Sequence, residues 1–69
     1  MGGRIKMKNT GKTVKFDSQT YGPVNLEVWA VKKGIYRLKF PNMEYWLNMG
    51  MGSANISAET IKKWFGLVI

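Results

Sequence analysis

The fold is decided by VNLEVWAVKKGIYRLKF, residues 24–40, in which two alternating runs flank a basic turn that contains glycine. Alternation of apolar and polar residues is typical of β-strands, and the loop between two strands decides which face each side chain takes. A two-residue loop of Lys33 and Gly34 would mix charged and aliphatic side chains on one face. A three-residue loop, with Gly34 in the left-handed bulge position, makes one face wholly apolar. The three-residue loop is therefore predicted.

This register gives the hairpin an apolar face and an outer face. The apolar face sets Leu26, Val28 and Ala30 opposite Phe40, Leu38 and Tyr36. The outer face sets Trp29 opposite Arg37, Glu27 opposite Lys39, and Val31 beside Ile35. Because the apolar face is complete without Trp29, this large aromatic side chain is predicted to point outward.

Two shorter alternating runs precede this hairpin. Residues 4–8 and residues 12–16 predict the first two strands, joined by a short loop over residues 9–11 in which Gly11 supplies a positive φ. The turn-forming stretch of residues 18–23 is predicted to separate that first hairpin from the rest of the chain.

Residues 44–49 predict a fifth strand, whose register the sequence leaves open. Either Trp46 shares the outer face, or the alternate residues Tyr45, Leu47 and Met49 do.

A short helix is predicted near the end of the chain. Ser57 is a suitable N-cap, and Ile56 and Ile61 are spaced as a hydrophobic staple across the first turn. The helix is expected to present Ile61, Trp64 and Phe65 as one apolar stripe, and Gly66 is a natural stop. The segment also resembles the start of a recognition helix in helix-turn-helix proteins, but without preceding helices a capping role at one end of the sheet is favoured.

These elements predict one domain over residues 1–69, mainly β, with a short C-terminal helix. The expected architecture is a small five-stranded antiparallel SH3-like barrel or a strongly bent sheet. The chain has neither cysteine nor histidine, so it cannot form a disulfide and lacks the two softest zinc ligands. Neither a metal nor a cofactor is expected.

The sequence offers little for catalysis. Its four carboxylates, Asp17, Glu27, Glu44 and Glu59, form no motif, and no phosphate-cradling or dinucleotide-binding loop occurs. We therefore expect a protein that is not an enzyme. No apolar run is long enough for a membrane span, and the N-terminus lacks the apolar core of a signal peptide, so a cytoplasmic location without membrane association is expected.

Charge indicates the class of partner. Eleven Lys and Arg against four Asp and Glu give a net charge of +7, which attracts phosphates irrespective of sequence. Nine of these eleven cations lie on the predicted strands and in the hairpin loop: Arg4, Lys6, Lys8, Lys12, Lys15, Lys32, Lys33, Arg37 and Lys39. Charged residues on strand edges also prevent aggregation of sheets, so both roles remain open.

An outward-facing Trp29 suits nucleic acid, because a tryptophan can stack on a base or enter a widened minor groove. Alternatively, Trp29 covers a second small core. The predicted binding residues are Trp29, Val31, Lys32, Lys33, Ile35, Arg37 and Lys39.

The layout, with residues 28–35 as the local match, resembles the small basic chromatin proteins of crenarchaea. This resemblance implies an SH3-like barrel whose sheet lies across the DNA minor groove, with Trp29, Val31, Ile35 and Arg37 on the contact surface. The helix of this chain is later and more apolar than in that family, and residues 50–55 do not match it.

The sequence thus predicts a nucleic-acid-binding protein, with duplex DNA as the favoured partner, little sequence preference, and association with the nucleoid if that holds. The alternative is a small phage-type protein that binds and inhibits or modulates a host enzyme or nucleoprotein complex through the same face. A third possibility is a structural subunit that buries Met49, Met51 and residues 68–69 on assembly. The sequence leaves the oligomeric state open.

Overall fold

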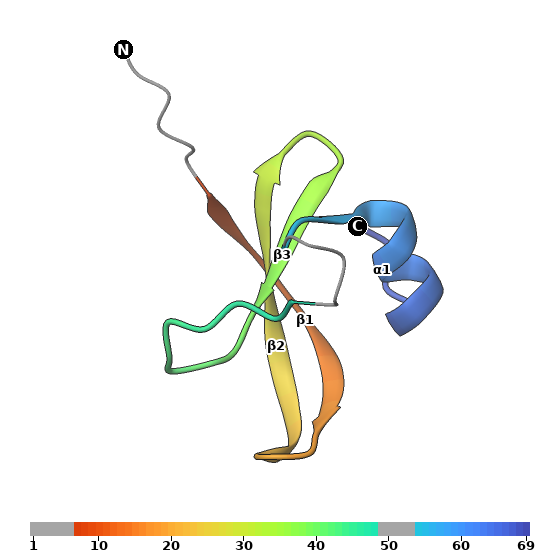
Figure 1. The fold of residues 1–69 in the computed structure, drawn as a ribbon. Helices are drawn as coiled ribbons and strands as arrows, with labels where there is room; N and C mark the ends of the chain where they lie inside the picture. The colour runs from red at the N-terminus through yellow and green to blue at the C-terminus, as the bar shows by residue number, and fades with distance from the viewer. Residues whose placement is uncertain (1–6, 49–53) are drawn as a thin grey trace.

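A computed structural model describes residues 7–48 and 54–69, which form one antiparallel sheet and one helix (Figure 1). The sheet has the strand order β1-β2-β3-β4. The elements are β1 (Lys8–Ser18), β2 (Gly22–Lys32), β3 (Ile35–Lys39), β4 (Ile56–Ser57) and α1 (Ala58–Phe65). A mainly β protein with a short C-terminal helix is confirmed. Five strands and closure into an SH3-like barrel are not confirmed.

The prediction of a hairpin within residues 4–16 is wrong for the part that the structure describes. Residues 8–18 form one continuous strand, and the stretch expected to turn is an irregularity in its pairing with β2 between Asn9 and Thr13. Gly11 has the expected positive φ of 83°, but it serves a bulge. Within the bulge, the Thr10 hydroxyl donates to the Val28 carbonyl at 2.8 Å and so joins β1 to β2. Residues 4–6 lie outside the described residues.

The stretch of residues 18–23, predicted to separate two hairpins, instead contains the turn of the first hairpin, between β1 and β2. Ser18 pairs with Gly22, so β1 returns directly into β2. The Ser18 hydroxyl accepts hydrogen bonds from the backbone N–H groups of Thr20 and Tyr21, at 3.2 and 3.0 Å. This side chain therefore closes the turn from within, as serine commonly does.

The predicted register of the second hairpin is confirmed at its centre. Val28 pairs with Leu38 and Ala30 with Tyr36 on one face, while Trp29 pairs with Arg37 and Glu27 with Lys39 on the other. Gly34 has a φ of 80°. The pairing expected beside the turn is wrong, because Lys32, not Val31, lies opposite Ile35 across a shift in register.

No strand forms over the described part of residues 44–49. A single bridge pairs Trp46 with Lys39, and the Leu47 N–H donates to the Leu38 carbonyl at 2.8 Å. β4 pairs with Ile35 and Tyr36, at the other end of this edge of β3. Since β3 has only five residues, the two segments share its edge and neither pairs along its whole length. Met49 lies outside the described residues.

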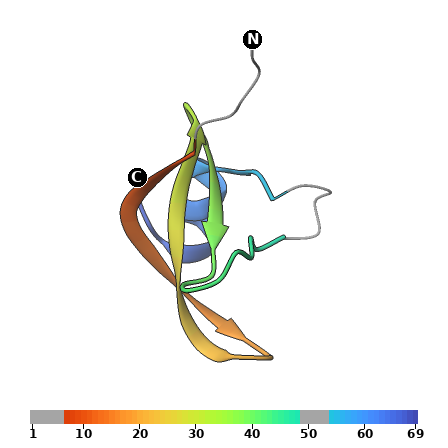
Figure 2. The same cartoon turned by 90° about the vertical axis from the view of Figure 1, so that its left-hand side faces the viewer.

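The core lies between one face of the sheet and α1. We call this the inner face; it carries Leu26, Val28 and Leu38, each at most 1% exposed, and Ile61 of α1 is fully buried against it. Figure 2 shows the helix behind β2 and β3. Val14, Phe40 and Ile56 complete the set of buried apolar residues.

The predicted ends of the helix are confirmed. The Ser57 side chain accepts from the Thr60 N–H, and Gly66 adopts the left-handed conformation. The predicted stripe is only partly correct: Ile61 and Phe65 pack toward the core, whereas Trp64 is 50% exposed. A helix of eight residues presents a narrow stripe to the sheet, and Leu67 beyond its end also packs against the core.

Candidate nucleic-acid interface

The outer face is the side of the sheet opposite α1, defined by Glu27, Trp29, Arg37 and Lys39. Strand pairing arranges its side chains in rows, because directly opposed residues share a face. The first row runs Asn9, Trp29, Arg37; the second runs Thr13, Glu27, Lys39, Trp46; the third holds Lys15 and Asn25. Two tryptophans and three cations therefore meet on one surface.

Trp29 lies at the centre of the outer face, as predicted, but it is half-buried, whereas an exposed side chain was expected. Its indole Nε1–H donates to Glu27 Oε1 at 3.0 Å. The Trp46 ring meets the Trp29 ring edge to face, with centroids 5.7 Å apart and an angle of 85° between the planes. This arrangement suits the quadrupoles of the two rings, so Trp29 is held in one orientation.

Lys39 and Glu27 form the polar part of the second row. The ammonium group of Lys39 lies 3.9 Å from Glu27 Oε1 and donates to the Phe40 carbonyl at 3.3 Å. The same carboxylate oxygen thus faces both the Lys39 ammonium and the indole N–H of Trp29. Glu27 is therefore partly neutralised, which limits its repulsion of an approaching anion.

Arg37 is oriented from outside the hairpin. Its Nε–H donates to Asn55 Oδ1 at 2.7 Å. Asn55 directly precedes β4, so the segment that pairs with the edge of β3 also positions this guanidinium. A planar guanidinium held beside aromatic rings can bind a phosphate or stack on a base.

The other predicted site residues lie toward the β2–β3 turn. Lys32 and Lys33 are exposed there, as expected for contacts with a phosphate backbone. Val31 is half-buried at the register shift, and Ile35 is half-buried between β2 and β4. Trp29, Arg37 and Lys39 are thus brought together, while Val31 and Ile35 lie nearer the β2–β3 turn.

Sequence reasoning left one member of this surface, Trp46, as an open alternative and missed another, Asn55. Trp46 was one of two open choices for residues 44–49, and its bridge with Lys39 places it on the outer face. No local pattern marks Asn55, because its contact with Arg37 joins residues far apart in the chain.

The remaining exposed lysines fall into two groups. Lys8, Lys12 and Lys15 lie along β1, at the edge of the sheet. Lys62 and Lys63 lie in the last turn of α1, where positive charge also favours the helix dipole. The cations therefore extend beyond the outer face.

Within residues 7–48 and 54–69, no group of three His, Cys, Asp or Glu side chains could hold a metal ion. In the same residues, no helix is both long and apolar enough to cross a membrane.

Comparison with known proteins gives no match: no family model, no curated protein and no solved structure is similar to this chain. The resemblance to crenarchaeal chromatin proteins therefore stays a hypothesis that depends on residues 28–35 and on the strand layout.

Proposed function

We propose that this chain binds nucleic acid through the outer face of its sheet, with duplex DNA as the favoured form and little preference for sequence. The observation that carries the proposal is the placement of Arg37 and Lys39 beside the Trp29–Trp46 pair, on the side of the sheet away from α1. The cations supply contacts with phosphates, and the rings supply an aromatic surface for sugars and bases.

The charge of the whole chain supports this proposal. Lys32 and Lys33 extend the basic surface past one end of the sheet, and Lys15 extends it along β1. Each phosphate neutralised by a cation releases counterions, which makes affinity fall steeply with salt. We expect electrostatic attraction to provide most of the affinity and the tryptophans to provide the remainder.

The mode of contact implied by the chromatin-protein resemblance, a sheet across the minor groove of DNA in an SH3-like barrel, belongs to the same proposal. Trp29 is anchored by Glu27 and Trp46, so it presents a fixed surface. Insertion between base pairs would need this packing to open. We therefore expect surface contact with the groove and at most a shallow wedge.

The test is fluorescence anisotropy of labelled DNA, titrated at several salt concentrations with the wild-type chain and three variants. Arg37→Ala and Trp29→Ala should each weaken duplex binding about tenfold, in keeping with a loss of about 1–3 kcal/mol per aromatic or bidentate contact. Trp64→Ala removes an exposed tryptophan from α1 and serves as the matched control. Single-stranded DNA and RNA of the same length show which form is preferred.

No binding to duplex DNA at low salt, or equal binding by the Trp29 and Trp64 variants, would contradict the proposal.

The second candidate is a protein partner, favoured by the Trp29 and Arg37 side chains, which are residue types enriched at the centres of protein interfaces. Its mark is tight association with one protein that depends weakly on salt, together with no affinity for DNA.

A further inference from the structure

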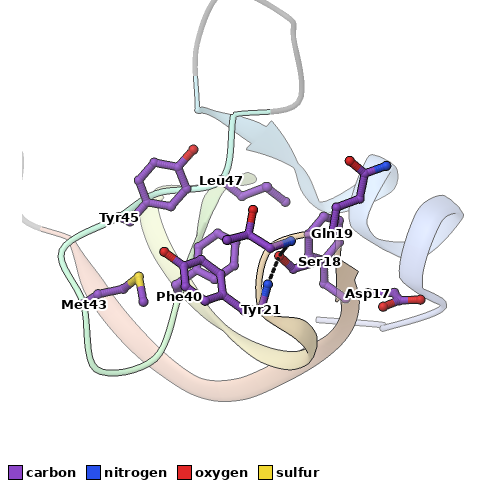
Figure 3. A pocket seen from close by; sticks show the side chains of 10 residues that line it. Asp17, Ser18, Gln19, Tyr21, Phe40, Met43, Tyr45 and Leu47 are labelled. Atoms are coloured by element: carbon purple, nitrogen blue, oxygen red, sulfur yellow. Dashed lines mark hydrogen bonds between the residues drawn. The ribbon is translucent and has the colours of Figure 1, made fainter.

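A pocket of about 620 Å³ lies between the β1–β2 turn and the segment that follows β3 (Figure 3). Its volume falls within the range of about 300–1,000 Å³ that is usual for sites of small ligands. Most of its apolar lining is aromatic, from Phe16, Tyr21, Phe40 and Tyr45, with Met43 and Leu47 completing it. The stretch Asp17–Thr20 supplies the polar wall.

The aromatic rings form one connected group around Phe40. The Tyr21 and Tyr45 rings lie 6.0 and 5.1 Å from the Phe40 ring, and Phe16 meets it edge to face at 6.3 Å. Phe40 is only 4% exposed, whereas Tyr21 is 57% and Tyr45 is 54% exposed. Phe40 is thus the fixed base of the group, and the two tyrosines present accessible ring faces.

The side chains that line this pocket differ in charge from the whole chain, which has a net charge of +7. The lining contains one carboxylate, Asp17, and neither lysine nor arginine. The cation of Lys39, next to Phe40 in the sequence, donates to the Phe40 carbonyl and is not part of the lining. Figure 3 shows Asp17 directed away from Tyr45 and Met43, so its carboxylate acts on a ligand at a distance.

We infer that this pocket binds an organic cation with a quaternary, methylated ammonium group. Such a group is attracted to the faces of aromatic rings, and the absence of lysine and arginine from the lining removes repulsion. It has no N–H, so it needs no hydrogen-bond acceptor. The ligand therefore does not need the Ser18 hydroxyl as a hydrogen-bond acceptor. That oxygen already accepts hydrogen bonds from two backbone N–H groups of the turn.

This inference does not depend on the proposed binding of nucleic acid. A phosphate would find one carboxylate and neither lysine nor arginine in the pocket lining, so the pocket and the outer face favour ligands of opposite charge. The ammonium group can belong to a free small molecule or to a methylated lysine side chain in a peptide.

The first test compares choline with the neutral alcohol in which a tert-butyl group replaces its trimethylammonium group. The two ligands have nearly the same shape and differ in charge. Titrations followed by NMR of the backbone amides and tyrosine rings should show choline binding at least about fivefold more tightly, the effect of one or two cation–π contacts. Equal affinity for both ligands, or no shift of Tyr21 or Tyr45 with choline, would overturn the inference.

Variants locate the effect. Tyr45→Leu keeps an apolar side chain but removes the ring, and it should weaken choline binding about fivefold while leaving the neutral alcohol unchanged. Trp64→Leu makes a similar change at an exposed residue of α1 and should alter neither ligand. Circular dichroism confirms that each variant is folded. Equal loss of both ligands in Tyr45→Leu would show a merely apolar pocket and overturn the inference.

Peptides distinguish the sources of the ammonium group. A short peptide with trimethyl-lysine that binds more tightly than choline would identify a modified protein as the source, and the reverse order would identify a small molecule. The same peptide with unmodified lysine should bind at least about fivefold more weakly, because its ammonium is more strongly hydrated. Equal binding of the two peptides would contradict recognition of the methylated group.

Discussion

The two faces of β2 differ in what holds their side chains. On the inner face, Leu26 and Val28 are fully buried in the apolar core, to which β1, β3 and α1 also contribute side chains. On the outer face, Glu27 and Trp29 are half-buried and a hydrogen bond joins them. Glu27 also pairs with the Lys39 ammonium, and the Trp29 ring contacts the Trp46 ring. Alternate residues of β2 thus have two different roles. The inner face stabilises the fold, and the outer face holds aromatic and charged groups in place for a ligand.

Adjacent alanine substitutions on β2 test this division most strongly. Leu26→Ala should lower the free energy of unfolding by about 2–5 kcal/mol, because it removes buried methyl groups and leaves a cavity. Total stability for a chain of this size is on the order of 3–10 kcal/mol, so the variant is expected to be partly unfolded at room temperature. Asn25→Ala alters the exposed residue immediately before Leu26. It should change the free energy of unfolding by less than about 0.5 kcal/mol.

Urea denaturation followed by circular dichroism measures both changes. Similar losses in the two variants would mean that the inner face is not the principal source of stability.

The β2–β3 hairpin could be predicted from sequence because its information is local. Period-two alternation and Gly34 in the turn assign the side chains from Glu27 to Ala30 and from Tyr36 to Lys39 to their faces. The prediction fails only beside the turn, where Lys32 pairs with Ile35. The ends of α1 were equally local, since Ser57 and Gly66 act within one turn of the helix. Outward placement of Trp29 followed from the same register.

Other features depend on contacts between distant residues. The bulge in β1 is stabilised by Thr10 bonding to Val28, and without that partner the Asn9–Gly11 stretch has the composition of a turn. The burial of Trp29 depends on Trp46, and the orientation of Arg37 depends on Asn55. The contacts of Trp46 and Asn55 require the chain after β3 to return along the edge of that strand, which no alternation of residues specifies. The pocket near Tyr21 and Tyr45 arises in the same way.

Trp29 and Trp46 form a ring pair on the outer face, and the strength of this contact can be measured. If Trp29 and Trp46 stabilise each other, a double-mutant cycle with Trp29→Leu and Trp46→Leu should give a coupling of about 1 kcal/mol, the usual value for an edge-to-face pair. A cycle that pairs Trp29→Leu with Trp64→Leu is the control, because Trp64 lies on α1 and packs on neither ring. Equal coupling in the two cycles would show that the outer face lacks a specific aromatic contact.

The smallest expected effect on stability concerns Glu27, the carboxylate in the second row of the outer face. Glu27→Gln keeps an oxygen that can accept from the Trp29 indole and removes an ion pair that is already long at 3.9 Å, so stability should change by less than about 0.5 kcal/mol.

Binding of DNA should respond more clearly to Glu27→Gln, because the variant releases Lys39 from its partner and adds one net positive charge to the face. We expect about a twofold gain in affinity at low salt that disappears at high salt, as screening shortens the range of the interaction. Glu59→Gln makes the same change of net charge in the first turn of α1 and is the matched control. A gain of equal size in that variant would assign the attraction to the charge of the whole chain, and a gain confined to Glu27→Gln would assign it to the outer face.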